Sequence, residues 1–189
     1  ASPRNVRMHV PLDEYKRNLA GIVAKAKKRF RYVVVLAPPP VHEPSFAALF
    51  WPSHYGHAAA PGEADRSLAL SAPYASAACT VARESSVACI DVWRRMQDAV
   101  PSPGGESWSN YKCDNGITPY PSAPVDAANT TWAGFLCDGL HLSPAGDRFV
   151  FEELMAVINA SFPDFAEWLH SGSTTARRAS LFWTSCAVA

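Results

Sequence analysis

Two short apolar runs constrain the fold of this chain more than any other feature of its sequence. In RYVVVLAPPP, residues 31–40, five apolar residues follow one another without alternation and stop at three prolines. The second run is VACIDV, residues 87–92. Unbroken apolar runs of this length are typical of strands that are buried on both faces of a parallel sheet. The sequence therefore predicts two such strands.

The segments around these runs have the residue spacing of helices. Apolar residues over 11–29 recur on one helical face with charges on the others, which predicts an amphipathic helix. Ser71 is predicted to cap a second helix, with Pro73 in its first turn. A third helix is predicted to begin around Trp93, whereas residues 41–71 before the second helix are predicted to be irregular, with at most one short helix. Alternating helices and buried strands predict an α/β domain with a parallel sheet.

The C-terminal part of the sequence predicts one further helix. Ser143 is a candidate N-cap and Pro144 suits the first turn, and the helix is expected to end at Pro163. Its predicted core face consists of Phe151, Leu154, Met155 and Ile158. Residues 101–136 are predicted to be a loop, and the tail from Ser171 has no periodicity. We expect one domain over 1–165 and an irregular tail over 166–189.

Composition and charge exclude several classes of protein. The 189 residues suffice for one domain, and 48% hydrophobic with 18% charged residues is a globular composition. Seventeen basic residues balance seventeen acidic ones, so no net field favours nucleic acid or an anionic membrane. The basic cluster over 25–31 lies at a predicted helix end, where it complements the helix dipole. No apolar run approaches the ~20 residues that a membrane span requires.

The five cysteines form no C-x-x-C pair, and their odd number does not suit a disulfide framework. The first ten residues, ASPRNVRMHV, lack the apolar region of a secretory signal. These observations together predict reduced thiols and a cytoplasmic location. The sequence makes no prediction of an oligomeric state.

The strongest candidate for chemistry is CDGLHLSPAGDRF, residues 137–149, in which Asp138 precedes His141 by three residues. A neutral imidazole can take the proton of a serine hydroxyl, and a carboxylate on its other nitrogen fixes the tautomer. A loop before a helix of an α/β fold is a common place for such groups. The alternative is a turn at Asp138-Gly139 followed by a half-buried histidine, and spacing alone favours this alternative.

Other candidate residues have weaker patterns. His54 and His57, with His42 nearby and Cys113 or Cys137 as further ligands, could form a metal site. The spacing is not that of a known metal motif, which favours ordinary loop histidines. The acid beside Cys137 disfavours a thiolate nucleophile there. Six aromatic residues either line an acyl or alcohol pocket or, as we favour, pack within surface loops: Trp51, Tyr55, Trp108, Tyr111, Tyr120 and Trp132. No glycine-rich loop for a nucleotide phosphate follows either strand.

The string DGLHLSPAGDRFVFEEL resembles the last conserved block of the SGNH (GDSL-type) hydrolases, which carries their catalytic Asp and His. Four upstream segments resemble the isoamyl-acetate-hydrolysing esterase branch in the same order: VPLDEYKRNLAGIV (10–23), YVVVLAPPPV (32–41), YASAACTVARE (74–84) and IDVWRRMQ (90–97). The resemblance implies a three-layer α/β/α flavodoxin-like fold and cleavage of small esters through an acyl-serine without a cofactor. It also implies that Asp138 orients the ring and that His141 is the general base.

The sequence departs from this family at its other functional blocks. The G-D-S nucleophile block, the glycine block and the G-x-N-D block are absent, and no Gly-x-Ser-x-Gly elbow replaces them. We therefore expect this chain to be the C-terminal portion of the hydrolase domain, lacking its first strands, inactive by itself and of marginal stability. The alternative is a truncated, non-catalytic protein that keeps the scaffold and acts, if at all, as a binding module.

Overall fold

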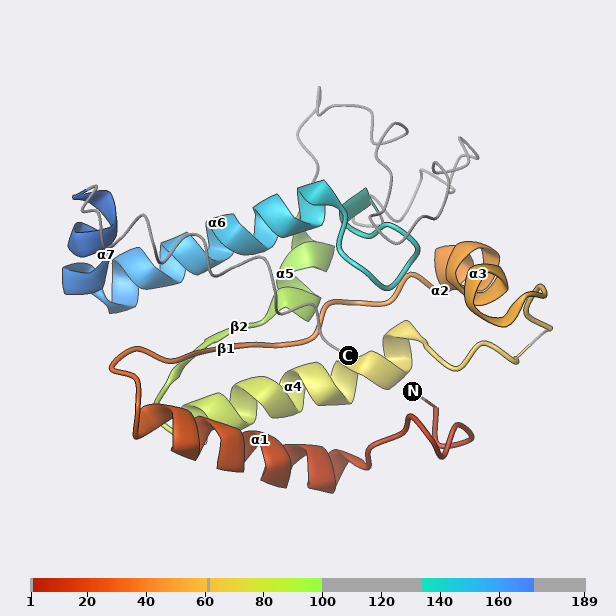
Figure 1. Cartoon of the computed structure of the whole chain (residues 1–189), viewed down its shortest axis with the longest axis horizontal. Helices are drawn as coiled ribbons and strands as arrows, with labels where there is room; N and C mark the ends of the chain where they lie inside the picture. The colour runs from red at the N-terminus through yellow and green to blue at the C-terminus, as the bar shows by residue number, and fades with distance from the viewer. Residues whose placement is uncertain (1, 61, 100–133, 172–189) are drawn as a thin grey trace. The chain divides into compact units, whose positions relative to one another are not determined.

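The computed structural model describes residues 2–60, 62–99 and 134–171 (Figure 1). The chain divides into two compact units after Phe151, and each is described by itself. The first unit contains the two predicted strands, β1 (Val34–Leu36) and β2 (Ala88–Ile90). They pair in parallel, with Val35 opposite Cys89, so the predicted α/β class with parallel strands is confirmed.

Helices α1 (Leu12–Lys27) and α4 (Leu68–Glu84) pack against each other, and α4 packs on both strands (Figure 1). In α1 the predicted amphipathic helix is confirmed, with Asp13 and Glu14 in the first turn and Lys25 and Lys27 in the last. This distribution of charge is favourable for the helix dipole.

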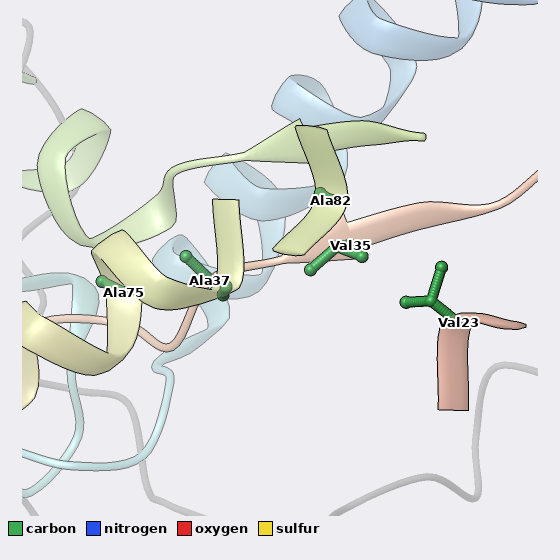
Figure 2. Packing of buried hydrophobic residues seen from close by; sticks show 6 residues of the cluster. Val23, Val35, Ala37, Ala75 and Ala82 are labelled. Atoms are coloured by element: carbon green, nitrogen blue, oxygen red, sulfur yellow. The ribbon is translucent and has the colours of Figure 1, made fainter. Parts of the chain in front are cut away.

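The core between these elements is made of small side chains (Figure 2). Its buried members are Val23 of α1, Val35 and Ala37 of the β1 segment, and Ala75, Ala78 and Ala82 of α4. Alanines allow the α4 backbone to approach the sheet closely, and alternation along the strand points Val35 and Ala37 to the same face. Leu36 points away from this core and is 38% exposed, so the expected burial of this run on both faces is wrong at Leu36.

The start of α4 differs from the prediction. The N-cap is Ser67, whose hydroxyl accepts a hydrogen bond from the Leu70 N–H at 3.1 Å. Ser71 lies inside the helix, where its hydroxyl donates to the Leu68 carbonyl and accepts from the indole of Trp93. Pro73 is consequently an internal residue of α4 rather than a first-turn residue. Asp91 caps α5 (Val92–Asp98), which begins close to the predicted position.

The segment after β1 is more helical than the sequence indicates. It forms α2 (Glu43–Ser45), the π-helix η1 (Phe46–Phe50) and α3 (Trp51–Tyr55) in direct succession. Gly56, with φ of 77°, ends this stretch in the left-handed conformation. The second hydrophobic cluster, around Phe46, Trp51 and Val41, explains why a segment that was predicted to be largely irregular orders into helix.

Cys79 of α4 and Cys89 of β2 form a disulfide, with their Cα atoms 5.3 Å apart. The expectation of reduced thiols is therefore wrong for this pair. Counting cysteines could not reveal it, because the pairing depends on α4 packing against β2 rather than on a spacing motif. The bridge joins the helix covalently to the strand that it covers.

The second unit holds the end of α6 (Pro144–Ser161) and α7 (Pro163–His170). Ile158 is buried as predicted, whereas Phe151, expected in the core face, is 59% exposed. Pro163 opens α7, which places residues 166–170 in a helix rather than in the expected irregular tail. Residues 101–133 of the loop predicted over 101–136, and residues 172–189 of the tail predicted from Ser171, lie outside the described residues. None of the described helices is long and apolar enough to cross a membrane.

Candidate active site

The Asp138–His141 segment is the tip of a short hairpin that leads into α6. An antiparallel bridge pairs Leu136 with Leu142, and the Cys137 N–H donates to the His141 carbonyl at 2.8 Å. Ser143 closes the hairpin, because its N–H donates to the carbonyl of Phe135 at 2.9 Å. The intervening residues are thus held in a turn whose geometry is fixed at both ends.

The predicted cap of α6 is confirmed at Ser143. Its hydroxyl oxygen accepts from the Gly146 N–H at 3.2 Å and donates to the Gly134 carbonyl at 2.8 Å. Gly146 packs so closely on the Phe135 carbonyl that a β-carbon at this position would collide with it. The hairpin and the first turn of α6 are therefore one packed unit that sets the position of the Asp–His pair.

Asp138 is fully buried and accepts three hydrogen bonds. Its Oδ2 lies 2.8 Å from Nδ1 of His141, and its Oδ1 accepts from the N–H groups of Leu140 at 3.0 Å and of His141 at 2.9 Å. A buried carboxylate that accepts several N–H groups is held in its ionised form. The carboxylate thus holds the imidazole ring and also accepts hydrogen bonds from the backbone N–H groups of the turn.

The contact between Asp138 and His141 shifts their pKa values in opposite directions. Burial acts to raise the pKa of Asp138, but the hydrogen bonds from the His141 ring and from two backbone N–H groups outweigh it, so this pKa is lowered. The hydrogen bond to Asp138 raises the pKa of His141, against an opposing effect of desolvation. The carboxylate thus stabilises the imidazolium that a general base forms when it takes a proton.

The site loop is anchored to the segment after β1 through Gly139. The His42 N–H donates to the Gly139 carbonyl at 2.9 Å. Gly139 has φ of 86°, and a β-carbon there would collide with the His42 carbonyl and the Phe46 amide nitrogen. Only glycine suits both the left-handed conformation and this close approach.

An aromatic ring lies beside His141. The ring of Phe50 lies 5.7 Å from the imidazole, and Phe50 stacks in turn on Phe46 and on His54. Trp51 is buried against Phe46 and Tyr55, which is internal packing. The candidate pocket residues Trp108, Tyr111, Tyr120 and Trp132 lie outside the described residues.

The three histidines considered for a metal site make separate contacts. Nδ1 of His42 lies 2.7 Å from the Ser45 hydroxyl, His54 stacks on Phe50, and Nε2 of His57 lies 3.2 Å from Glu63. Burial lowers the pKa of His42, which favours its neutral form. Within the described ranges, no group of three or more potential ligands gathers around one point. Cys113 falls outside those ranges.

The hydroxyls of two described serines, one next to the site loop and one in the segment after β1, are engaged elsewhere. The hydroxyl of Ser143 bonds to Gly134, and that of Ser45 contacts the His42 ring. No described residue hydrogen-bonds to Nε2 of His141, and the histidine side chain is 55% exposed. The described part of the chain thus presents an imidazole that is held at Nδ1 by a buried carboxylate and has no described hydrogen bond at Nε2.

Sequence reasoning missed Phe50 and His42 as neighbours of the Asp–His pair. The only signal for them was that both follow β1, because the residues after the carboxyl ends of parallel strands gather at one edge of the sheet.

Known proteins are similar to this chain over most of its length. No protein-family model matches the sequence. A GDSL esterase/lipase of Arabidopsis thaliana is 32% identical over 148 residues, which cover 77% of this chain and 47% of the plant protein. The human isoamyl acetate-hydrolyzing esterase 1 homolog is 26% identical over 158 residues, 82% of this chain and 48% of the human protein.

A solved structure shares the fold. The crystal structure of a lipase/acylhydrolase from Enterococcus faecalis matches with a TM-score of 0.50 at 15% identity, over 82% of this chain and 54% of the other. These matches confirm the resemblance and the fold class that the sequence predicted. The chain spans about half the length of the curated relatives it matches.

Proposed function

We propose that this chain, a homologue of the GDSL esterase/lipases over most of its length, carries the acid–base part of a serine esterase site. The reaction is hydrolysis of small carboxylic esters, such as acetates, through an acyl-serine. The observation that carries the proposal is the 2.8 Å contact between buried Asp138 and Nδ1 of His141. Asp138 and His141 are the two site residues, and no cofactor or metal takes part.

In this proposal each ring nitrogen of His141 has its own role. Nδ1 donates its hydrogen to Asp138, so the lone pair is on Nε2, which takes the proton of the nucleophilic hydroxyl. The same nitrogen then returns the proton to the alcohol as it leaves. Asp138 holds the tautomer and stabilises the imidazolium between these two steps.

We further propose that the nucleophilic serine and the oxyanion-hole donors are supplied by sequence that this chain does not contain. The absence of the G-D-S, glycine and G-x-N-D blocks from the sequence supports this. Loss of one oxyanion donor alone costs ~2.7–4 kcal/mol of transition-state stabilisation, so the chain by itself is expected to be inactive.

The cytoplasmic location stays a prediction. The Cys79–Cys89 disulfide counts against it, because such bridges are rare in reducing compartments.

A first experiment measures hydrolysis of a short acetate ester by this chain and by its His141→Ala variant. We expect no activity from either. Activity that disappears in His141→Ala would place the nucleophile within this chain and overturn the proposal of an external serine. Activity that survives in His141→Ala would remove His141 from the mechanism.

A second experiment tests the acid–base role directly. The matching half of the Arabidopsis relative is replaced by this chain, and the chimera is assayed with and without His141→Ala. We expect an active chimera that loses its turnover in the variant. A chimera that unfolds cooperatively but is inactive favours the alternative of a non-catalytic binding module.

A further inference from the structure

A pocket of about 320 Å³ lies beside the site loop in the first unit. Its lining is mainly apolar and includes Val10, Tyr15, Pro38, Leu70, Tyr74 and Leu140. The pocket lies where β1 ends and α4 begins, which is the edge of a parallel sheet at which ligands of α/β proteins bind.

Leu140 connects the pocket to the Asp–His pair. It immediately precedes His141, its N–H donates to Asp138, and it packs against the Val41 and Phe46 cluster. A ligand that contacts Leu140 is therefore one residue away from the imidazole along a turn that is held by hydrogen bonds.

The N-terminal segment over residues 2–10, of which Met8 and Val10 line the pocket, is held in place by polar contacts. Buried Asp65 accepts from the Asn5 side chain at 2.5 Å, and its carbonyl accepts from the Ser2 N–H at 2.7 Å. The Tyr74 hydroxyl donates to the Val10 carbonyl at 2.6 Å. These contacts involve both ends of the segment over residues 2–10, so the segment is held in place beside the pocket.

The charge of the pocket favours a neutral ligand. Arg66 is its charged lining residue, and its guanidinium donates to Asp65 at 2.9 Å, which offsets the charge. Met8, Val10 and Leu70 line the pocket while 61%, 42% and 38% exposed, and an apolar ligand would cover part of this surface.

We propose that this pocket binds the alkyl portion of a small, neutral aliphatic ester and so sets the chain length that the site accepts. Its volume is at the lower end of the ~300–1,000 Å³ of small-molecule pockets, which favours short chains over long acyl chains. The assignment of the ligand as an ester rests on the proposed esterase function, whereas binding of the apolar group does not.

Methionine methyl signals provide a direct test on this chain. It contains three methionines, of which Met8 lines the pocket, whereas Met96 is fully buried elsewhere and Met155 is not in the lining. The probe is a branched methyl ketone in which a methylene replaces the ester oxygen of isoamyl acetate. We expect a saturable shift of the ¹³C-methyl signal of Met8 with the signals of Met96 and Met155 unchanged. No shift of Met8 up to the solubility of the probe would overturn the proposal.

Variants separate this pocket from general apolar binding. Leu70→Trp should fill the pocket and raise the Kd for the ketone at least tenfold. Ile22→Trp is the matched control, because Ile22 is a 62% exposed residue of α1 that does not line the pocket. An unchanged Met96 signal verifies the fold of each variant, and equal loss of binding in both variants would contradict the proposal.

The proposal of a ligand pocket and the proposal of esterase function can be rejected independently of each other. His141→Ala should keep the Met8 shift, because the ketone needs no base. A Met8 shift together with a folded but inactive chimera would support binding of the apolar group in the pocket and reject the esterase function. An active chimera whose chain-length preference is unchanged by Leu70→Trp would reject the pocket as the determinant of chain length.

Discussion

Asp138 contacts His141 through both the side chain and the main chain of the histidine. Oδ2 lies 2.8 Å from Nδ1, and Oδ1 accepts the His141 N–H at 2.9 Å. The carboxylate therefore fixes the turn and the ring together, so the imidazole is held in one orientation.

Replacing Asp138 should separate its structural role from its chemical role. Asp138→Asn keeps an oxygen for the two backbone N–H groups, whereas Asp138→Ala leaves buried donors unsatisfied. We expect Asp138→Ala to lower the free energy of unfolding by about 3 kcal/mol and Asp138→Asn by clearly less. In the active chimera both variants should lose turnover, since the amide favours the wrong tautomer. Equal denaturant midpoints for the two variants would contradict the structural role.

The pH dependence of the pair follows from the two pKa shifts. The raised pKa of His141 gives a stabilisation that is fully present below its ordinary value of 6.5 and is lost as pH rises through the folded-state pKa. The lowered pKa of Asp138 gives a stabilisation present above 3.8 and lost as pH falls through its folded-state value. The pair therefore stabilises the fold most between these limits.

An NMR titration of the His141 imidazole checks this expectation. We expect a pKa above 6.5 in the unmodified chain and a lower pKa in Asp138→Asn. Esterase activity of the chimera should fall as pH decreases through the same value, because the base must be neutral. A titration at or below 6.5 in the unmodified chain would be inconsistent with the contact.

Alanine substitutions at three glycines test the close approach of the site loop to the segment after β1. Only Gly139 makes this approach, and Gly56 and Gly21 are comparisons in open space. Gly139→Ala combines a left-handed φ of 86° with a backbone collision and should destabilise the fold by more than about 2 kcal/mol. Gly56→Ala has φ of 77° in open space and should cost roughly 1 kcal/mol from backbone strain alone. Gly21→Ala, within α1 and in open space, should stabilise by up to about 1 kcal/mol. Chemical denaturation measures this order, and equal costs at 139 and 56 would argue against the close approach to His42.

The Cys79–Cys89 bridge should contribute to stability. It closes a loop over a sequence separation of 10, for which the loss of unfolded-state entropy is worth about 2–3 kcal/mol. We expect Cys79→Ser/Cys89→Ser to lower Tm under oxidising conditions. Non-reducing peptide mapping should recover a fragment that joins the two cysteines, and free thiols at both positions would contradict the bridge.

Local patterns predicted a large part of the fold. The periodicity of α1 predicted its face, the apolar runs predicted β1 and β2, and the Ser143-Pro144 pair predicted the start of α6. The same locality explains the prediction of the candidate site, because a residue separation of three lets Asp138 reach His141 within one turn. Such interactions depend on neighbours along the chain, so they can be predicted from the sequence alone.

Some local patterns pointed to the wrong residue. Ser71 was the predicted N-cap, whereas Ser67 caps α4 and Ser71 lies inside the helix, where it accepts a hydrogen bond from the Trp93 indole. Phe151 fits the helical spacing of a core residue, yet it is exposed because no local rule specifies what a helix face will meet.

The sequence by itself determined the class of the fold, the positions of its strands and the closeness of Asp138 to His141. Only the tertiary structure decided that Gly139 packs on His42, that Phe50 flanks His141, that Cys79 pairs with Cys89, and that a pocket opens beside Leu140. The physical reason is distance along the chain. Hydrogen bonds within a turn are set by adjacent residues, whereas contacts across tens of residues form only when burial of the whole core brings those segments together.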